Sequence, residues 1–418
     1  MKKIGILLLL LTFTWLAHAQ SNVYVVTMKS TFESPVLDSR TDNADRITQA
    51  QQNQGKRNNK QAKLDMFIQN KGLTNVRSRF MDVKIGFITP LTDSQRADLL
   101  NDPNVESVVE DVDIQGRPIM QGDPGSQGRP IMQGRPIMQS DAMSPSWLYD
   151  PNGRASCAIN LVNGSDNSSS RRESIWIIDT GVDANHRDLN VNRQQGVAIS
   201  MIPGESPFDD VLGHGTHCAG LVAGRGTGPI SATGVSSGAE IIPLKVFASN
   251  GIGSWSKILM ALDHVAKYGQ VGDVVLMSLG SYNVSNCEVS NPLLTSAIKA
   301  IAAKGMFVVM SAGNDGGDAG RNLPGCINGN NIFTVGALDF SCGSLGSKYS
   351  ASNFGSGVDY FVPGSNVFST WPGGQYMVMS GTSMSAAIMA GIIHATRGNP
   401  RSSGTINIGG INYRIASK

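Results

Sequence analysis

Three short strings place a carboxylate, an imidazole and a hydroxyl along this chain. Asp179 lies in Ile-Ile-Asp-Thr-Gly-Val-Asp, His214 in Gly-His-Gly-Thr-His-Cys-Ala-Gly, and Ser383 in Gly-Thr-Ser-Met-Ser-Ala. A serine hydroxyl is a poor nucleophile at neutral pH, so it needs a base to take its proton and an acid to orient that base. Asp, His, Ser is one of the chain orders in which such triads occur. The strings therefore predict acyl-transfer chemistry, with Ser383 as nucleophile, His214 as base and Asp179 as its partner.

Apolar patterning predicts the elements that position these residues. Four short apolar runs suit parallel strands that are covered on both faces, at residues 175–178, 241–246, 274–277 and 306–310. Between them, apolar residues repeat at helical spacing over 258–266 and 293–301. This alternation favours a parallel sheet with helices on both sides. Asp179 then ends a buried strand, at the edge where open parallel sheets bind ligands. The alternative for Asp179 is a turn-forming carboxylate before Gly181.

The three strings resemble those of the subtilases, a family of serine proteases, over about residues 146–395. The resemblance implies a three-layer α/β/α domain with a central parallel sheet. It also implies that Asn314, in Ser-Ala-Gly-Asn-Asp-Gly, donates its side-chain N–H to the oxyanion formed during attack. The backbone N–H of Ser383, at a helix N-terminus, would be the second donor. The alternative is that Asn314 only shapes a turn.

The same resemblance implies substrate-binding residues. Two segments would form the edges of the primary specificity pocket and a third would pair with an extended peptide; the residues are Ser278, Leu279, Gly280 and Gly313 for the pocket, and Gly251 and Ile252 for the pairing strand. Backbone pairing gives affinity without much sequence choice. Because no acidic cluster stands out, we expect a broad preference for apolar or uncharged side chains before the cut bond.

The N-terminal third divides into three parts. Residues 1–19 have a basic start, an apolar run of about a dozen residues and Ala-His-Ala, which predicts a secretory signal peptide rather than an uncleaved anchor. Residues 20–114 favour a small α+β unit, with strands at 23–28, 84–88 and 105–112, a helix-permissive stretch at 45–69, and a capping box that opens a helix at Thr92. This unit resembles the inhibitory propeptide of many subtilases; an unrelated small domain is the alternative.

A repetitive segment separates this unit from the main domain. Residues 115–145 contain Gln-Gly-Arg-Pro-Ile-Met-Gln three times, starting at Gln115, Gln127 and Gln133. Gly and Pro in each copy disfavour helix and central strand. We therefore expect a linker that is readily cut, with a recognition peptide as the alternative. Residues 146–418 form the peptidase domain, closing in a hairpin around Gly409-Gly410. Related domains usually continue further, so one or two terminal helices are expected to be missing.

Five cysteines in an exported chain allow disulfides and leave at least one thiol that is unpaired or pairs between chains. Cys218, four residues after His214, is the best candidate for the free thiol: either a buried small hydrophobe or a site where a bulky reagent displaces His214. The other four cysteines allow three pairings. No cofactor is expected to be required. The resemblance points to a structural calcium ligand at Asp188, but residues 226–233 lack the usual Asn, so a solvated carboxylate is an equal alternative.

The charge balance sets the expected partners. Lys and Arg number 34 against 32 Asp and Glu, a net charge of +2, which gives no reason to expect nucleic acid or an anionic membrane. We expect a secreted, monomeric subtilisin-like serine endopeptidase, made as a zymogen, with polypeptide substrates and its own propeptide as inhibitor. One alternative is a non-catalytic, protease-like binding or inhibitory protein. Another is an esterase, but Ser383 does not lie in a Gly-x-Ser-x-Gly elbow.

Overall fold

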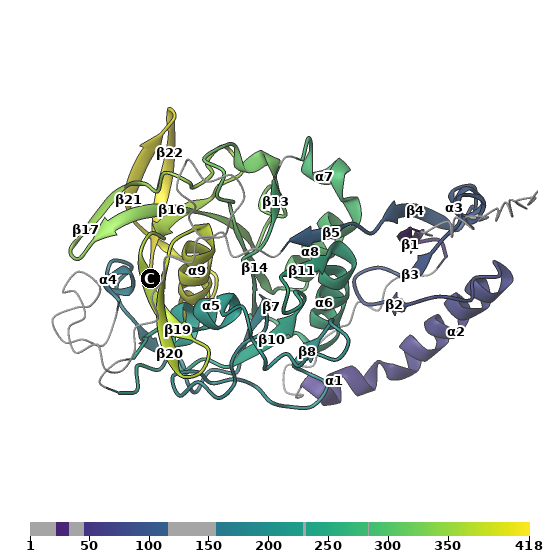
Figure 1. Cartoon of the computed structure of the whole chain (residues 1–418), viewed down its shortest axis with the longest axis horizontal. Helices are drawn as coiled ribbons and strands as arrows, with labels where there is room; N and C mark the ends of the chain where they lie inside the picture. Colours follow the sequence, from purple (N-terminus) through teal and green to yellow (C-terminus); the bar gives the residue numbers. More distant parts are fainter. Residues whose placement is uncertain (1–21, 33–45, 116–155, 229–230, 283) are drawn as a thin grey trace, which may run out of the picture.

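A computed structural model describes residues 22–32, 46–115, 156–228, 231–282 and 284–418. These residues form an N-terminal domain (22–115) and a larger C-terminal domain (156–418) that lie side by side (Figure 1). The predicted signal peptide and nearly all of the repetitive linker lie outside the described residues.

A large, mainly parallel sheet forms the centre of the C-terminal domain. Its strands, in spatial order, are β21 (Arg401–Ile408), β22 (Ile411–Ser417), β18 (Tyr360–Pro363), β16 (Ile332–Ser341), β14 (Phe307–Ser311), β12 (Val274–Met277), β7 (Ile175–Asp179), β10 (Ile241–Lys245) and β8 (Ile199–Ser200), with β17 (Ser344–Lys348) paired to β16. All neighbours from β22 to β8 run parallel. The four predicted apolar runs are confirmed as β7, β10, β12 and β14.

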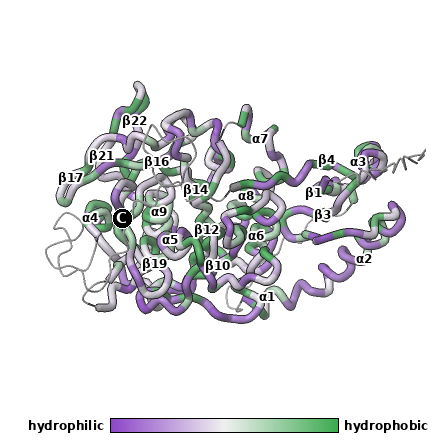
Figure 2. The backbone as a smooth tube through the Cα atoms, in the orientation of Figure 1, coloured by the Kyte–Doolittle hydropathy of each residue, from purple (hydrophilic) through white to green (hydrophobic). Residues whose placement is uncertain are grey.

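Helices cover both faces of this sheet, as predicted for a three-layer α/β/α domain. α6 (Trp255–Tyr268) and α8 (Pro292–Ala303) lie on one face, and α4 (Cys157–Asn160), α5 (His214–Ala223) and α9 (Thr382–Thr396) lie on the other (Figure 1). α6 and α8 begin where Ser254 and Asn291 accept hydrogen bonds from backbone N–H groups of the first turn. Figure 2 shows apolar positions gathered in the central strands and α6.

The N-terminal domain is a four-stranded antiparallel sheet with three described helices, of which the second and third pack on the sheet and the first packs against α6 of the other domain. The strand order is β2 (Ser78–Phe80), β3 (Gly86–Pro90), β1 (Val23–Met28) and β4 (Val105–Glu110), and the helices are α1 (Arg46–Gln52), α2 (Gln54–Asn70) and α3 (Asp93–Leu100). The predicted capping box at Thr92 is confirmed. Side chains of β1 alternate, so Val26 enters this domain's own core while Val25 packs with residues of α6 and α8.

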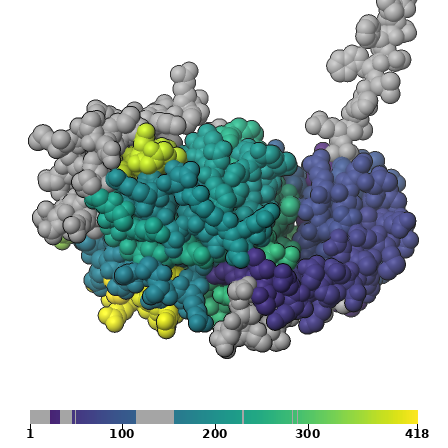
Figure 3. Space-filling view, turned by 90° about the horizontal axis from the view of Figure 1, so that it is seen from below, coloured from purple at the N-terminus to yellow at the C-terminus, as the bar shows by residue number. Residues whose placement is uncertain are grey.

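The end of the N-terminal domain pairs with the C-terminal domain. β5 (Asp113–Gln115) runs antiparallel to β11 (Ile252–Ser254), with Ile114 opposite Gly253. Figure 3 shows the N-terminal domain, in purple and blue, lying against the teal surface of its neighbour. The sequence places the end of this unit at residue 114; in the structure its last strand forms a separate two-stranded sheet with β11 of the other domain.

Small elements complete the C-terminal domain. Three two-stranded sheets pair β6 (Asp166–Asn167) with β9 (Ser236–Ser237), β13 (Ser281–Tyr282) with β15 (Asn322–Leu323), and β19 (Val367–Trp371) with β20 (Gln375–Met379). The short helices are α7 (Cys287–Ser290) and the 3-10 helix Ala319–Arg321. The predicted C-terminal hairpin is confirmed as β21 and β22, which extend the central sheet. Among the described helices, none is long and apolar enough to cross a membrane.

The two disulfides settle the cysteine pairing. Cys157 bonds to Cys342 and Cys287 bonds to Cys326. The prediction that Cys218 is the free thiol is confirmed, and its side chain is buried.

Candidate active site

The carboxylate of Asp179 and the imidazole of His214 are in direct contact. Asp179 is the last residue of β7, and His214 is the first of α5. His214 Nδ1 lies 2.8 Å from Asp179 Oδ1 and 2.9 Å from Oδ2. Both side chains are buried. The carboxylate can therefore fix the imidazole with Nδ1 protonated, which leaves Nε2 free to accept a proton.

Two glycines allow this approach. Gly213, the residue before α5, has φ of 78°, in the left-handed region that favours glycine. A Cβ on Gly215 would lie 2.0 Å from the carbonyl oxygen of Gly181, in the turn that follows β7. The first turn of α5 therefore packs directly on the backbone beside Asp179, which explains why glycines flank His214.

Ser383 lies in the first turn of α9 and is joined to Ser278 by two hydrogen bonds. The Ser383 hydroxyl donates to the Ser278 carbonyl at 3.3 Å, and the Ser278 hydroxyl donates to the Ser383 carbonyl at 2.9 Å. Backbone N–H groups in a first helical turn have no intrahelical acceptor and lie at the positive end of the helix dipole. Ser383 thus combines a reorientable hydroxyl with an N–H available to an anion.

The Asn314 side chain is fixed against the start of α9. Its Oδ1 accepts a 2.8 Å hydrogen bond from Thr382 N, and the neighbouring Gly313 N donates to Thr382 Oγ1 at 3.2 Å. With Oδ1 engaged, Nδ2 is the end of the amide that can donate to another group. The loop after β14 therefore places the Asn314 Nδ2 donor next to the start of α9, where Ser383 lies.

Asp210 is a buried carboxylate that the sequence analysis did not single out. It accepts hydrogen bonds from Thr180 Oγ1 at 2.7 Å, Gly213 N at 2.8 Å, and the N and Oγ1 of Thr216 at 2.8 and 2.7 Å. It therefore fastens the turn after β7 to the first turn of α5. Burial raises the pKa of Asp210, and the nearby Asp179 charge raises it further. Its position four residues before His214 was the only signal in the sequence.

Lys245 is a second buried charge that the sequence analysis missed. It ends β10, directly opposite Asp179 of β7, and its side chain is fully buried. Its Nζ donates to the Thr180 carbonyl at 2.6 Å and lies 3.3 Å from Glu205 Oε2. The ammonium therefore fastens the backbone that directly follows Asp179.

The charges around His214 set its protonation. Burial lowers the pKa of His214, but the carboxylates of Asp179 and then Asp210 outweigh it, so the pKa is raised overall. His217, in the same motif, differs: burial lowers its pKa to about 3, and its Nε2 donates to the Met377 carbonyl at 3.1 Å. His217 is therefore a neutral structural residue. Only His214 of this pair is poised to exchange a proton near neutral pH.

Cys218 lies beside the same pair. Its Sγ and one ligand atom each of Asp179 and His214 lie within 4.8 Å of one another. Burial raises the pKa of the Cys218 thiol, and the Asp179 charge adds to the effect. The thiol is therefore held in its neutral form, as a packed side chain under the imidazole.

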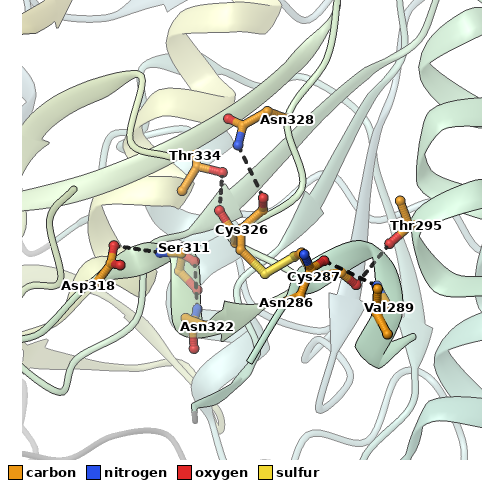
Figure 4. The surroundings of a disulfide bond; sticks show 12 residues. Asn286, Cys287, Val289, Thr295, Ser311, Asp318, Asn322, Cys326, Asn328 and Thr334 are labelled. Atoms are coloured by element: carbon orange, nitrogen blue, oxygen red, sulfur yellow. Dashed lines mark hydrogen bonds between the residues drawn. A yellow bond between two sulfur atoms is a disulfide. The ribbon is translucent and has the colours of Figure 1, made fainter. Parts of the chain in front are cut away.

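The expected substrate-binding residues lie at the same sheet edge. Ser278, Leu279 and Gly280 follow β12, and a Cβ on Gly280 would lie 3.0 Å from Asn322. Gly313 follows β14 and packs on Asn322 and Asn353. Figure 4 shows that Asn322, which donates to the Ser311 carbonyl at 3.3 Å, lies near the Cys287–Cys326 disulfide. Gly251 directly precedes β11, and Ile252 is the first residue of β11, the strand that pairs with β5.

The surroundings of Asp188 do not fit a calcium ligand. Its Oδ1 accepts from Thr227 N and Oγ1 at 2.8 and 2.7 Å, and its Oδ2 accepts from Ala232 N and the Tyr376 hydroxyl, both at 2.8 Å. A Ca²⁺ ligand presents its oxygen lone pairs to the ion, whereas these oxygens face four donors. The side chain is also fully buried, so it is not the solvated carboxylate of the alternative either.

This chain is similar in sequence to known proteins. A family model described as the subtilase family matches residues 170–401, which is more than half of the chain and includes Asp179, His214, Asn314 and Ser383. The chain belongs to the subtilase family. A subtilisin-like protease of Coccidioides posadasii is 36% identical over 230 residues, covering 54% of this chain and 53% of its own length. The alkaline serine protease ver112 of Corniculantispora psalliotae is 29% identical over 334 residues, covering 77% of this chain and 75% of its own.

A solved structure is also similar to this subtilase. The crystal structure of a cold adapted subtilisin-like serine proteinase aligns with 27% identity and a TM-score of 0.48, over 58% of this chain and 85% of that chain. The present chain spans about half the length of the first curated relatives that it matches.

Proposed function

We propose that this subtilase is a serine endopeptidase that cuts polypeptides through Asp179, His214 and Ser383. The observation that carries the proposal is the pair of short contacts from His214 Nδ1 to both oxygens of Asp179, at 2.8 and 2.9 Å. A carboxylate in this position holds Nε2 as the proton acceptor and stabilises the imidazolium that forms. Membership of the subtilase family supports the same chemistry.

The reaction begins with reorientation of the nucleophile. The Ser383 hydroxyl turns from the Ser278 carbonyl to His214 Nε2, and such contacts commonly tighten only when substrate is bound. Its oxygen then attacks the substrate carbonyl while its proton passes to Nε2. The carbonyl π electrons move to the oxygen, where Asn314 Nδ2 and the Ser383 backbone N–H donate to the resulting oxyanion.

Collapse of this intermediate breaks the peptide bond. His214 returns the proton to the departing amine, and the acyl group stays as an ester on Ser383. Water then attacks the ester with His214 again as base, which releases the acid product and restores the hydroxyl. Asp210 and Lys245 act through Asp179 and His214 as positioning residues, because their hydrogen bonds fix the backbone on either side of them.

The N-terminal domain is the inhibitor of this reaction in our proposal. β5 pairs with β11, the strand expected to receive an extended substrate, so Asp113–Gln115 takes a place that a peptide would need. Two carboxylates fasten the domains beside it. Asp111 accepts from Ser256 N, in the first turn of α6, at 3.0 Å. Asp263 of α6 accepts from the backbone N–H groups of Met81, Asp82 and Val83 at 2.6 to 3.2 Å.

The remaining features of the proposal concern substrate and location. Backbone pairing along β11 favours extended polypeptides with a broad preference for apolar or uncharged side chains. The predicted signal peptide, together with the two disulfides, supports an extracellular enzyme. We propose that the enzyme requires no cofactor, since every step above is performed by side chains, a backbone N–H and water. We also propose that it is a monomer.

The test compares the full chain with two serine variants. Ser383→Ala removes the proposed nucleophile. Ser385→Ala removes a hydroxyl two residues further along α9 that donates to the Val362 and Pro363 carbonyls, so it is a matched control. We expect the wild type and Ser385→Ala to lose roughly the first 115–145 residues, cleave a peptide library and react with a fluorophosphonate. Ser383→Ala should stay whole, inert and unlabelled.

An opposite result would replace the proposal. If the wild type is folded but cleaves no peptide, even after the linker has been cut by an added protease, the chain is a protease-like binding protein. Labelling of Ser383→Ala by the fluorophosphonate would assign the nucleophile to another serine.

A further inference from the structure

Arg46, the first residue of α1, is buried against the C-terminal domain. One guanidinium nitrogen, Nη2, donates to Asp273 Oδ1 at 2.9 Å, while Nη1 donates to Asp273 Oδ2 and, at 3.2 Å, to the Tyr268 carbonyl. The guanidinium carbon lies 5.4 Å from the centre of the Trp176 ring. Only 7% of Arg46 and 0% of Asp273 is exposed, so this is a buried ion pair between the two domains.

The C-terminal domain builds the receiving side of this contact by itself. Asp273 also accepts hydrogen bonds from Ser174 N at 2.9 Å, Trp176 Nε1 at 2.9 Å and Gln270 N at 2.8 Å. These three donors belong to the same domain as Asp273, so they orient its carboxylate whether or not Arg46 is present. The carboxylate, the Tyr268 carbonyl and the Trp176 ring together form what we call the Asp273 pocket.

The chemistry of the Asp273 pocket selects a guanidinium group. Its two carboxylate oxygens match the fork of an arginine, and the indole offers a face on which a planar cation can lie. A lysine ammonium is a compact point charge that cannot make two parallel hydrogen bonds to one carboxylate. The pocket should therefore distinguish Arg from Lys, which is a stronger requirement than a need for positive charge.

The Asp273 pocket and the catalytic residues lie at opposite edges of the sheet. Ser174 and Asp273 directly precede β7 and β12, whereas Asp179 ends β7. At about 3.3 Å per residue, the five steps from Ser174 to Asp179 correspond to roughly 16 Å. Arg46 therefore does not depend on the pairing of β5 with β11, and the two contacts hold the N-terminal domain at separate points.

We propose that the Asp273 pocket is an arginine-binding site that anchors the propeptide independently of the cleft. This inference rests on the proposed role of the N-terminal domain as inhibitor. An anchor far from the cleft makes rebinding of the cleft contacts intramolecular, which slows full release far more than the cleft contacts alone. After the linker is cut, the propeptide then stays bound until Arg46 has separated from Asp273, in addition to the cleft strand and the contacts of Asp111 and Asp263. Its departure leaves a preformed pocket that accepts an arginine side chain.

The experiment follows release of the propeptide from an inactive chain. The full chain carries Ser383→Ala and a recognition sequence for a site-specific protease in the linker, and dissociation of the cut propeptide is measured by dilution. Arg46→Met should raise the dissociation constant about thirtyfold or more, because truncating one partner of a buried charge pair leaves the other unpaired. Arg46→Lys should remain clearly weakened. The control is Arg77→Met, which removes an exposed arginine from the same domain.

Two further measurements keep the inference testable if Arg46 also affects folding of α1. In a double-mutant cycle with Asp273→Asn, the second substitution should add little to the first, since both remove the same contact. A peptide of residues 46–52 should slow reassociation of the propeptide, and the same peptide with Arg46→Lys should not. Equal dissociation constants for wild type and Arg46→Met, or fully additive effects in the cycle, would overturn the proposal. Because the chain is inactive, loss of the protease proposal would not affect these readings.

Discussion

The hydroxyl of Thr180 donates a 2.7 Å hydrogen bond to the carboxylate of Asp210. Thr180 follows Asp179 in the chain, and Asp210 also accepts from the N–H of Gly213, which precedes His214. One buried carboxylate therefore holds both neighbours of the Asp179–His214 pair. The alignment of Asp179 and His214 therefore depends on Asp210, which makes no hydrogen bond to the imidazole ring and has no part in the proposed contacts to substrate.

Replacing Asp210 by Asn should lower kcat more than it changes KM. The new amide would point N–H donors at the N–H groups of Gly213 or Thr216, and an unsatisfied buried donor costs about 1–3 kcal/mol. Part of this cost should appear as misalignment of His214, and part as a lower free energy of unfolding. Steady-state kinetics of the processed enzyme measures the first and urea denaturation the second. Asp209→Asn, at the exposed neighbouring position, is the control, and an equal effect there would remove Asp210 from this role.

The pH profile of kcat/KM should show an acid limb above the ordinary histidine pKa of about 6.5. His214 acts as a base only when it is neutral, and the carboxylates of Asp179 and Asp210 raise its pKa. Activity is therefore lost as pH falls through this raised value. Asp210→Asn removes one of the two charges, so its acid limb should move to lower pH. An acid limb that starts below pH 6, or that ignores the Asp210 charge, would contradict this account of the base.

Asn314→Ala should reduce kcat by about 10²–10³ and leave KM nearly unchanged. The expected size is that found for the comparable donor in subtilisin, a member of the same family. The reason is that the Asn314 amide meets a charge that exists only after attack, so its loss raises the barrier and not the binding energy. Asn328→Ala removes an exposed asparagine elsewhere in the domain and should keep full activity. A parallel rise in KM would assign Asn314 to ground-state binding instead.

Binding of the propeptide should weaken as pH rises toward 7. Burial in the interface raises the pKa of Asp263 to about 7, with the neighbouring Asp82 charge as the second cause. Once the propeptide leaves, Asp263 meets water and its pKa returns toward the ordinary value of about 3.9. The docked state thus holds an extra proton between these two values, so docking is favoured at low pH and lost progressively as pH rises through that window.

The measurement is the dissociation constant of the cut propeptide from the Ser383→Ala chain between pH 5 and pH 8. Asp263→Asn keeps an acceptor but cannot ionise, so it should flatten this dependence. Arg57, which pairs with Asp82, must be left intact in both proteins. Tighter binding at pH 8 than at pH 5 would show that the opposite sign holds.

Removing the Cys287–Cys326 disulfide should destabilise the protein and disturb the pocket near Gly280. Replacing both cysteines by serine frees a chain segment 39 residues long, which typically lowers the free energy of unfolding by about 2–4 kcal/mol. Asn322 links this disulfide to the pocket, because its carbonyl accepts a hydrogen bond from Cys326 N and its side-chain amide donates to the Ser311 carbonyl. KM should therefore rise as well. Denaturation and kinetics of the double variant check both. Unchanged values for both would mean that packing alone holds this loop.

The residues proposed to react could be picked out from the sequence because they lie in local strings. Asp179, His214 and Ser383 each have glycine neighbours that serve the backbone, and Gly215 shows why, since a side chain there would strike the Gly181 carbonyl. The apolar runs also predicted the four central strands, because strands buried on both faces need apolar residues throughout.

Contacts between distant segments were not predictable in the same way. Asp210 and Lys245 look like ordinary charged residues in the sequence, and their roles arise only when β7, β10 and α5 meet. Asp188 is the reverse case. The family pattern suggests a calcium ligand, but Thr227, Ala232 and Tyr376 donate hydrogen bonds to its carboxylate oxygens. Arg46 likewise needs a partner 227 residues away to show its use.

The bond between Cys157 and Cys342 has a consequence for the cutting of the chain that we propose. Cys157 lies at the start of the described part of the C-terminal domain and is joined to the turn after β16, 185 residues later. After a cut anywhere between residues 116 and 155, the new N-terminal segment would therefore stay bonded to the domain through Cys157, which lies at least one residue from the new end. Under the proposed maturation, the first described residues of the C-terminal domain would therefore stay joined to its core wherever in this range the chain is cut.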